Sequence, residues 1–167
     1  MAEGGKPEIR RPNREKPESR RTRALIALLL IASAALIAVV TIGGWDKLEG
    51  AKAVPPAYVL IYVVFAFYVS RWNRGVLPVA SALAIILIIF AAVAAPAWFD
   101  RDKAGFDDPA LPPSLLGILT LLIIPLQVIL IAVAMRGFRQ QWNIEAGSRA
   151  AMDAGLEPST STGAGAR

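Results

Sequence analysis

The chain has 167 residues, of which 55% are hydrophobic and only 19% charged, whereas a soluble domain carries about 25% charged residues. It contains neither cysteine nor histidine, which excludes disulfides, thiolate metal sites, histidine-ligated haem and a serine–histidine–aspartate triad within this sequence. The formal net charge of +5 comes from basic residues that lie beside apolar blocks, which favours contact with a lipid bilayer over binding to nucleic acid.

Residues 1–23 are polar and charged and show no apolar period. Prolines recur every five residues at Pro7, Pro12 and Pro17, and basic residues outnumber acidic ones. This composition predicts a disordered basic arm on the cytoplasmic side, which orients the protein in the membrane. A direct contact with lipid or with a partner is the alternative interpretation of the same residues.

Four uncharged apolar blocks follow, at residues 24–44, 53–70, 75–99 and 114–135. Each is at least about 18 residues long, which suffices to cross a hydrocarbon core of about 30 Å. One such block could be a core helix of a soluble protein, but four leave too little polar chain to cover them. The sequence therefore predicts an all-α fold, an integral membrane four-helix bundle.

Residues at the block ends agree with these spans. Pro55, Pro56 and Pro78 lie in predicted first turns, where proline is tolerated because the amide has no partner within the helix. Ser114 is the expected N-cap of the fourth helix. Tryptophans at or beyond block ends are typical of rings at headgroup level, and this sequence has four of them there: Trp45, Trp72, Trp98 and Trp142.

The distribution of charge predicts the orientation. The loop at residues 71–75 has two arginines and no acid, and Arg136 and Arg139 follow the fourth block. Segments 46–52 and 100–113 carry acidic residues as well as basic ones. Because cytoplasmic loops are enriched in lysine and arginine, we expect both termini in the cytoplasm and the protein in the cell membrane.

A cleaved signal peptide is the alternative to a first span. Arg23, the apolar run from Ala24 and the small residues Ala32-Ser33-Ala34 have the order of a signal sequence, which would remove residues 1–34. The apolar run continues to Val40, however, which favours a span. Cleavage would leave the predicted orientation of the rest unchanged.

After the fourth block we expect a short interfacial helix within residues 136–154, with Phe138 and Trp142 on one face beside the two arginines. Residues 155–167 are small and polar, and their composition predicts a disordered cytoplasmic tail.

The four block interiors contain no Asp, Glu, Lys or Arg. Ionisable residues at membrane depth mark proton relays, coupling-ion sites and voltage sensors, so their absence argues against these functions. The aspartates near Asp100 and Asp102 lack the spacing of a calcium-binding loop. We therefore expect no catalytic residue, no cofactor and no bound metal.

Three polar residues of the blocks are candidates for contacts inside the membrane: Tyr62, Thr120 and Gln127. Pro125 leaves the carbonyl of Leu121 without its helical donor, which predicts a kink beside Gln127. Tyr62 and Gln127 lie at comparable depth on the second and fourth helices, so we predict a hydrogen bond between them. A polar point on a substrate or quinone-like pocket is the alternative for Gln127.

Three classes of function remain open. The favoured one is a non-catalytic accessory or structural subunit that packs against other membrane subunits or against its own copies. The second is a small oligomeric transporter or channel. The third is a membrane enzyme, which would have to use tyrosine, serine or loop aspartates such as Asp100 and Asp102.

Overall fold

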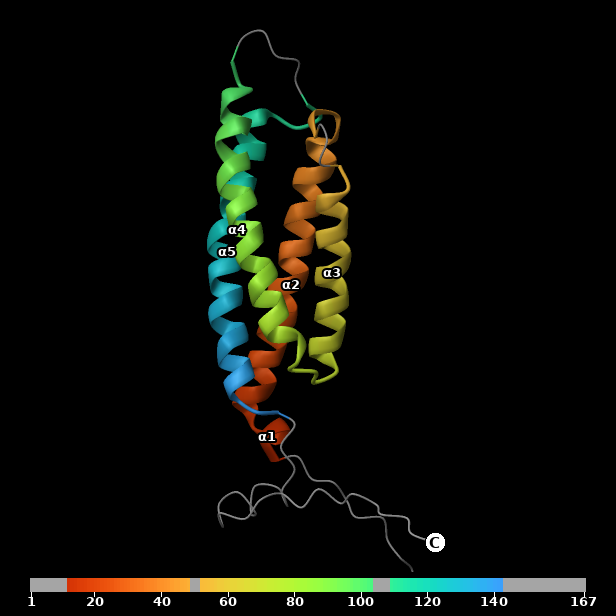
Figure 1. Ribbon diagram of the computed structural model, residues 1–167, viewed down its shortest axis with the longest axis vertical. Helices are drawn as coiled ribbons and strands as arrows, with labels where there is room; N and C mark the ends of the chain where they lie inside the picture. The colour runs from red at the N-terminus through yellow and green to blue at the C-terminus, as the bar shows by residue number, and fades with distance from the viewer. Residues whose placement is uncertain (1–11, 49–51, 104–108, 143–167) are drawn as a thin grey trace, which may run out of the picture.

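The computed structural model describes residues 12–48, 52–103 and 109–142, and within these ranges every regular element is a helix. In Figure 1 the long helices lie side by side, with a short helix beneath them. In chain order the elements are α1 (Pro12–Glu15), α2 (Pro17–Gly43), a short 3₁₀ turn (Trp45–Lys47), α3 (Val54–Ser70), α4 (Val76–Asp100) and α5 (Pro113–Arg139).

Within the described residues, three helices are long and apolar enough to cross a membrane. These are α2 and α5, with 27 residues each, and α4, with 25. Helix α3 is equally apolar but has 17 residues, which corresponds to about 26 Å at the rise of an α-helix. The chain is therefore an all-helical protein whose three long apolar helices and one shorter apolar helix suit a membrane bundle.

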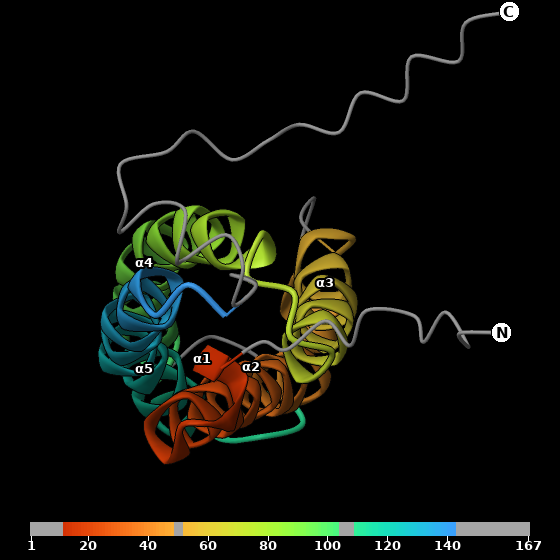
Figure 2. The same ribbon diagram turned by 90° about the horizontal axis from the view of Figure 1, so that it is seen from below.

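The long helices α2, α3, α4 and α5 run alternately up and down (Figure 1). Helix α2 packs against both α3 and α5, and α5 packs most extensively against α4. Helices α3 and α4 have few contacts, so the order around the bundle is α3, α2, α5, α4 (Figure 2). The start of α2, the 71–75 loop and the end of α5 consequently meet at one end.

Apolar side chains, large and small, form most of the bundle interior around a few polar ones, and large apolar side chains also cover its outside. On α4 the buried stripe includes Ala80, Ala84, Ala91 and Ala95, which lets the backbone of α5 approach closely. Outside, Ile42 is 72% exposed and Val93 is 73% exposed. An apolar exterior, together with the alanine stripe between α4 and α5, is expected of helices that face lipid.

The structure corrects the expected disordered arm over the second half of residues 1–23. Residues 12–15 form α1, and α2 begins at Pro17 rather than at residue 24. Proline suits this first helical position because its missing amide would have no partner there. Hydropathy did not reveal this start because the first turns of α2 are charged. Residues 1–11 lie outside the described part.

The opposite terminus also differs from expectation. Arg136 and Arg139 lie in the last turn of α5 and do not begin a separate helix. Gln141 has a φ of 48°, which turns the chain so that Trp142 folds back and is fully buried, while Phe138 remains exposed. These two rings therefore do not share a helix face. Residues 143–154 of the expected interfacial helix and the tail 155–167 lie outside the described residues.

Two further details of helix ends correct the sequence analysis. Helix α5 begins at Pro113 with Pro112 at the cap position, so Ser114 is not its N-cap. Trp98 is buried instead of facing outward. Its ring lies against Gly44, where any added Cβ would overlap it, so the lack of a side chain at this glycine makes room for the ring.

Candidate functional site

A chain of hydrogen bonds joins three helices inside the bundle. The Tyr62 hydroxyl on α3 donates to Oε1 of Gln127 on α5 at 2.9 Å. The Gln127 Nε2 donates to Oγ of Ser33 on α2, also at 2.9 Å. Ser33 in turn donates to the carbonyl of Leu29 at 2.7 Å. Tyr62, Gln127 and Ser33 are all fully buried, so these bonds replace water for their polar groups.

The hydrogen bond between Tyr62 and Gln127 that the sequence led us to expect is present. Thr120 is buried too, but its hydroxyl donates to the carbonyl of Leu116 in its own helix at 2.7 Å, and it does not join the network. Ser33, the second partner of Gln127, was not among the residues expected from the sequence. Its position in the middle of α2 was the available signal.

Pro125 lies within α5, which continues through it as one helix. Both Pro125 and Leu121 are exposed, so the carbonyl that proline leaves without a donor belongs to the outer side of the helix, away from Gln127. The bend at this position stays a prediction. Structurally, the proline and the glutamine are separate features of α5.

Tyr58 extends the polar contacts to the fourth helix. Its ring meets that of Tyr62 edge-on, with centroids 5.8 Å apart, and its hydroxyl donates to the carbonyl of Leu83 on α4 at 3.3 Å. Together with the Tyr62–Gln127–Ser33 bonds, this contact ties all four long helices to one another. These hydrogen bonds hold the helices in position, because each group of the network already has a protein partner.

A second cluster closes the end of the bundle where the start of α2 and the end of α5 meet. The rings of Trp72 and Trp142 pack edge-on at 5.5 Å. The Arg23 guanidinium lies 4.3 Å from the Trp72 ring centroid and donates to the carbonyl of Ser70 at 2.9 Å. Arg14 approaches the same ring at 5.7 Å and donates to the Trp142 carbonyl at 3.2 Å. Such cation–π contacts favour the folded arrangement.

Hydrogen bonds also hold the returning chain after α5. Gln140 donates to the Thr22 hydroxyl at 3.1 Å and accepts a bond from the Trp142 indole at 3.0 Å. Asn13 donates to the carbonyl of Gln141 at 3.1 Å. We call Arg14, Arg23, Trp72, Gln140 and Trp142 the tryptophan clasp. The tryptophan clasp was not expected from the sequence, because partners 128 residues apart leave no local pattern.

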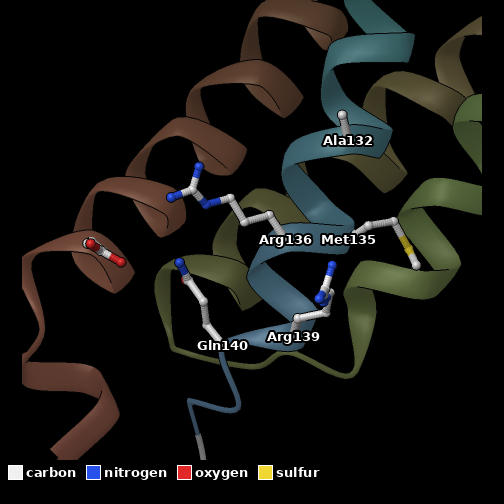
Figure 3. A pocket seen from close by; sticks show the side chains of 6 residues that line it. Ala132, Met135, Arg136, Arg139 and Gln140 are labelled. Atoms are coloured by element: carbon white, nitrogen blue, oxygen red, sulfur yellow. The ribbon is translucent and has the colours of Figure 1, made fainter.

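Beside the tryptophan clasp, an open groove of about 590 Å³ separates the first turns of α2 from the last turns of α5. Figure 3 shows Arg136 and Gln140 projecting from α5 toward α2, with Arg139 on the next turn. A smaller cavity of about 220 Å³ adjoins it and shares Glu18, Arg139 and Gln140 with it. The six residues that line the groove are Glu18, Ala132, Met135, Arg136, Arg139 and Gln140.

Within residues 12–48, 52–103 and 109–142, no group of three acidic side chains is placed to hold a metal ion. Asp100 pairs with Lys103 at 2.7 Å, one turn along the chain. The fold and these sites define the class of protein: an all-helical protein with membrane-suited apolar helices, an internal polar brace and a basic groove at one end. No family model, no curated protein and no solved structure matches the chain.

Proposed function

We propose that this chain is a non-catalytic, four-span protein of the cell membrane that serves as an accessory or structural subunit of a larger membrane assembly. The observation that carries the proposal is the use of its buried polar groups. Tyr62, Gln127 and Ser33 bond to one another across three helices, and the groove at the bundle end does not reach them. Buried polar groups that bond to one another across helices favour a packing role over catalysis or transport.

The outside of the bundle supports the same proposal. Exposed positions on α2, α3, α4 and α5 are dominated by leucine, isoleucine, valine and phenylalanine. No charged residue lies between Ala24 and Gly43, or between Pro113 and Met135. A channel assembled from several copies would require a polar stripe facing its pore. The uncharged exterior suits lipid or the apolar surface of a membrane partner instead.

We place both termini on the cytoplasmic side, with α3 as the second of four spans. Helix α3 is about 26 Å long, slightly less than the thickness of a typical hydrocarbon core. Local thinning of the bilayer accommodates such a mismatch. The bundle end that carries Arg23, Arg71, Arg74, Arg136 and Arg139 is the more basic one, and the positive-inside tendency assigns it to the cytoplasm.

The absence of cysteine allows a clean test of this orientation with single cysteines at the exposed positions Lys52, Asn73 and Asp102. A membrane-impermeant maleimide added to intact cells is expected to label Lys52→Cys and Asp102→Cys, and to label Asn73→Cys only after permeabilisation. The reverse pattern would contradict the orientation. Labelling of Lys52→Cys and Asn73→Cys from the same side would show that α3 does not cross.

The accessory role predicts that the full-length chain, extracted in mild detergent and affinity-purified, retains another membrane protein in stoichiometric amount. An unrelated four-span protein with the same tag and expression level is the control. Recovery of a homo-oligomer alone would favour the transporter or channel. Recovery of a monomer alone would contradict the accessory role.

A further inference from the structure

We propose that the groove between the start of α2 and the end of α5 binds the headgroup of a phospholipid with a primary amine, such as phosphatidylethanolamine. Its phosphate would lie at Arg136 and Arg139, and its ammonium group at Glu18. This inference goes beyond the subunit role. It relies only on that part of the proposed function which places the helices in a membrane.

The groove is layered as a lipid is layered. Ala132, Met135, Arg136 and Arg139 follow the spacing of a single face of α5, and all four are exposed. Ala132 lies nearest the middle of the helix, Met135 and Arg136 follow at the same height, and Arg139 lies nearest its end (Figure 3). An acyl chain therefore meets the apolar part while the headgroup meets the cationic part.

Both arginines are available for a ligand. In the part of the chain that the structure describes, neither Arg136 nor Arg139 forms an ion pair, a hydrogen bond or a cation–π contact. Their planar guanidinium groups suit the oxygens of a phosphate, which they bind through paired N–H donors. The phosphodiester of a phospholipid headgroup carries the negative charge that the arginines attract. It also lies at the membrane surface, where the end of α5 places them.

Glu18 distinguishes one headgroup from another. It lines the groove from α2, opposite the arginines, and among the described residues it pairs with no basic group. A purely anionic headgroup would bring negative charge toward this carboxylate. A headgroup that carries both a phosphate and an ammonium satisfies the arginines and Glu18 in one molecule, and a primary ammonium adds hydrogen-bond donors that a quaternary one lacks.

The tryptophan clasp shapes one wall of this site. Gln140 lines the groove, yet its amide is already bonded to Thr22 and to Trp142. That wall is consequently fixed before any lipid arrives, so binding does not require ordering of the α5 terminus.

Native mass spectrometry of the full-length protein in detergent tests the proposal. The protein is titrated with phosphatidylethanolamine, phosphatidylglycerol and phosphatidylcholine of identical acyl chains. We expect phosphatidylethanolamine to bind most tightly. Arg136→Gln combined with Arg139→Gln is expected to weaken both phosphatidylethanolamine and phosphatidylglycerol at least about ten-fold, since each charge-assisted bond is worth roughly that factor.

Glu18→Gln is the decisive variant, because the amine assignment predicts opposite effects on two lipids. It should weaken phosphatidylethanolamine about five- to ten-fold and leave phosphatidylglycerol unchanged or tighter. Arg71→Gln is the matched control: it removes one arginine at the same bundle end but outside the groove, and it should alter neither affinity.

Three outcomes would overturn the proposal: tighter binding of phosphatidylglycerol than of phosphatidylethanolamine by the unmodified protein, an equal effect of Glu18→Gln on both lipids, or a loss of binding in Arg71→Gln as large as in the double variant. All variants change exposed side chains, and size-exclusion chromatography verifies that each remains folded. The lipid titration uses the isolated chain. Its result therefore does not depend on whether the affinity purification recovers a partner protein.

Discussion

Trp142→Ala is expected to lower the free energy of unfolding by about 3–5 kcal/mol, the cost of removing a buried tryptophan from a packed site. The indole is fully buried and packs edge-on against Trp72. Its N–H bonds to Gln140, which also holds Thr22. The truncation therefore leaves a cavity and releases the contact between the end of α5 and the start of α2.

Equilibrium unfolding in mild detergent, titrated with a denaturing detergent, measures this change. Trp45→Ala is the matched control, because Trp45 is 43% exposed at the other end of the bundle and contacts Lys52 through a cation–π interaction at 5.6 Å. Its truncation should cost less than about 1 kcal/mol. Equal effects of the two substitutions would contradict the structural role assigned to the tryptophan clasp.

Gln127→Leu should destabilise the bundle by about 1–3 kcal/mol, because it leaves the fully buried Tyr62 hydroxyl without an acceptor. Tyr62→Phe removes the other partner, leaves the buried Gln127 Oε1 without its donor and should cost a similar amount. The double variant is expected to cost less than the sum of the two by about 0.6–1.7 kcal/mol, the range of helix–helix hydrogen bonds in membranes.

Thr120→Val is the control for this cycle. Thr120 is buried on the same helix, but its hydroxyl bonds only to Leu116 one turn away. Its effect should be small and should add to that of Gln127→Leu, since the two residues share no partner. Strict additivity of Tyr62→Phe and Gln127→Leu would mean that their hydrogen bond does not stabilise the bundle.

Local properties of the chain explain why most helix positions followed from the sequence. A run of apolar residues becomes a helix of matching length because the backbone must satisfy its own hydrogen bonds where water is absent. The expected starts at residues 53, 75 and 114 therefore fall within one residue of Val54, Val76 and Pro113. The charged first turns of α2 and last turn of α5 escaped notice, because helical hydrogen bonding continues where hydropathy ends.

The position of a residue along its helix also follows from the local sequence. Tyr62 and Gln127 lie at comparable depth, and their hydrogen bond could therefore be predicted. The contact of Ser33, the third member of the network, could not be predicted in this way. Ser33 and Gln127 are 94 residues apart, and serine can equally bond within its own helix, as Ser33 also does with Leu29. The sequence around Ser33 and the sequence around Gln127 do not indicate that α2 lies beside α5.

By itself, then, the sequence determined that the chain forms long apolar helices with a sparse polar interior, since those properties depend on residue type and spacing along one segment. Tertiary structure alone decided the order of helices around the bundle, the return of Trp142 onto Trp72, and the meeting of Glu18 with the α5 arginines at one groove. The physical reason is that each of these contacts joins distant segments whose pairing follows from how complete helix faces fit together, which no single stretch of sequence records.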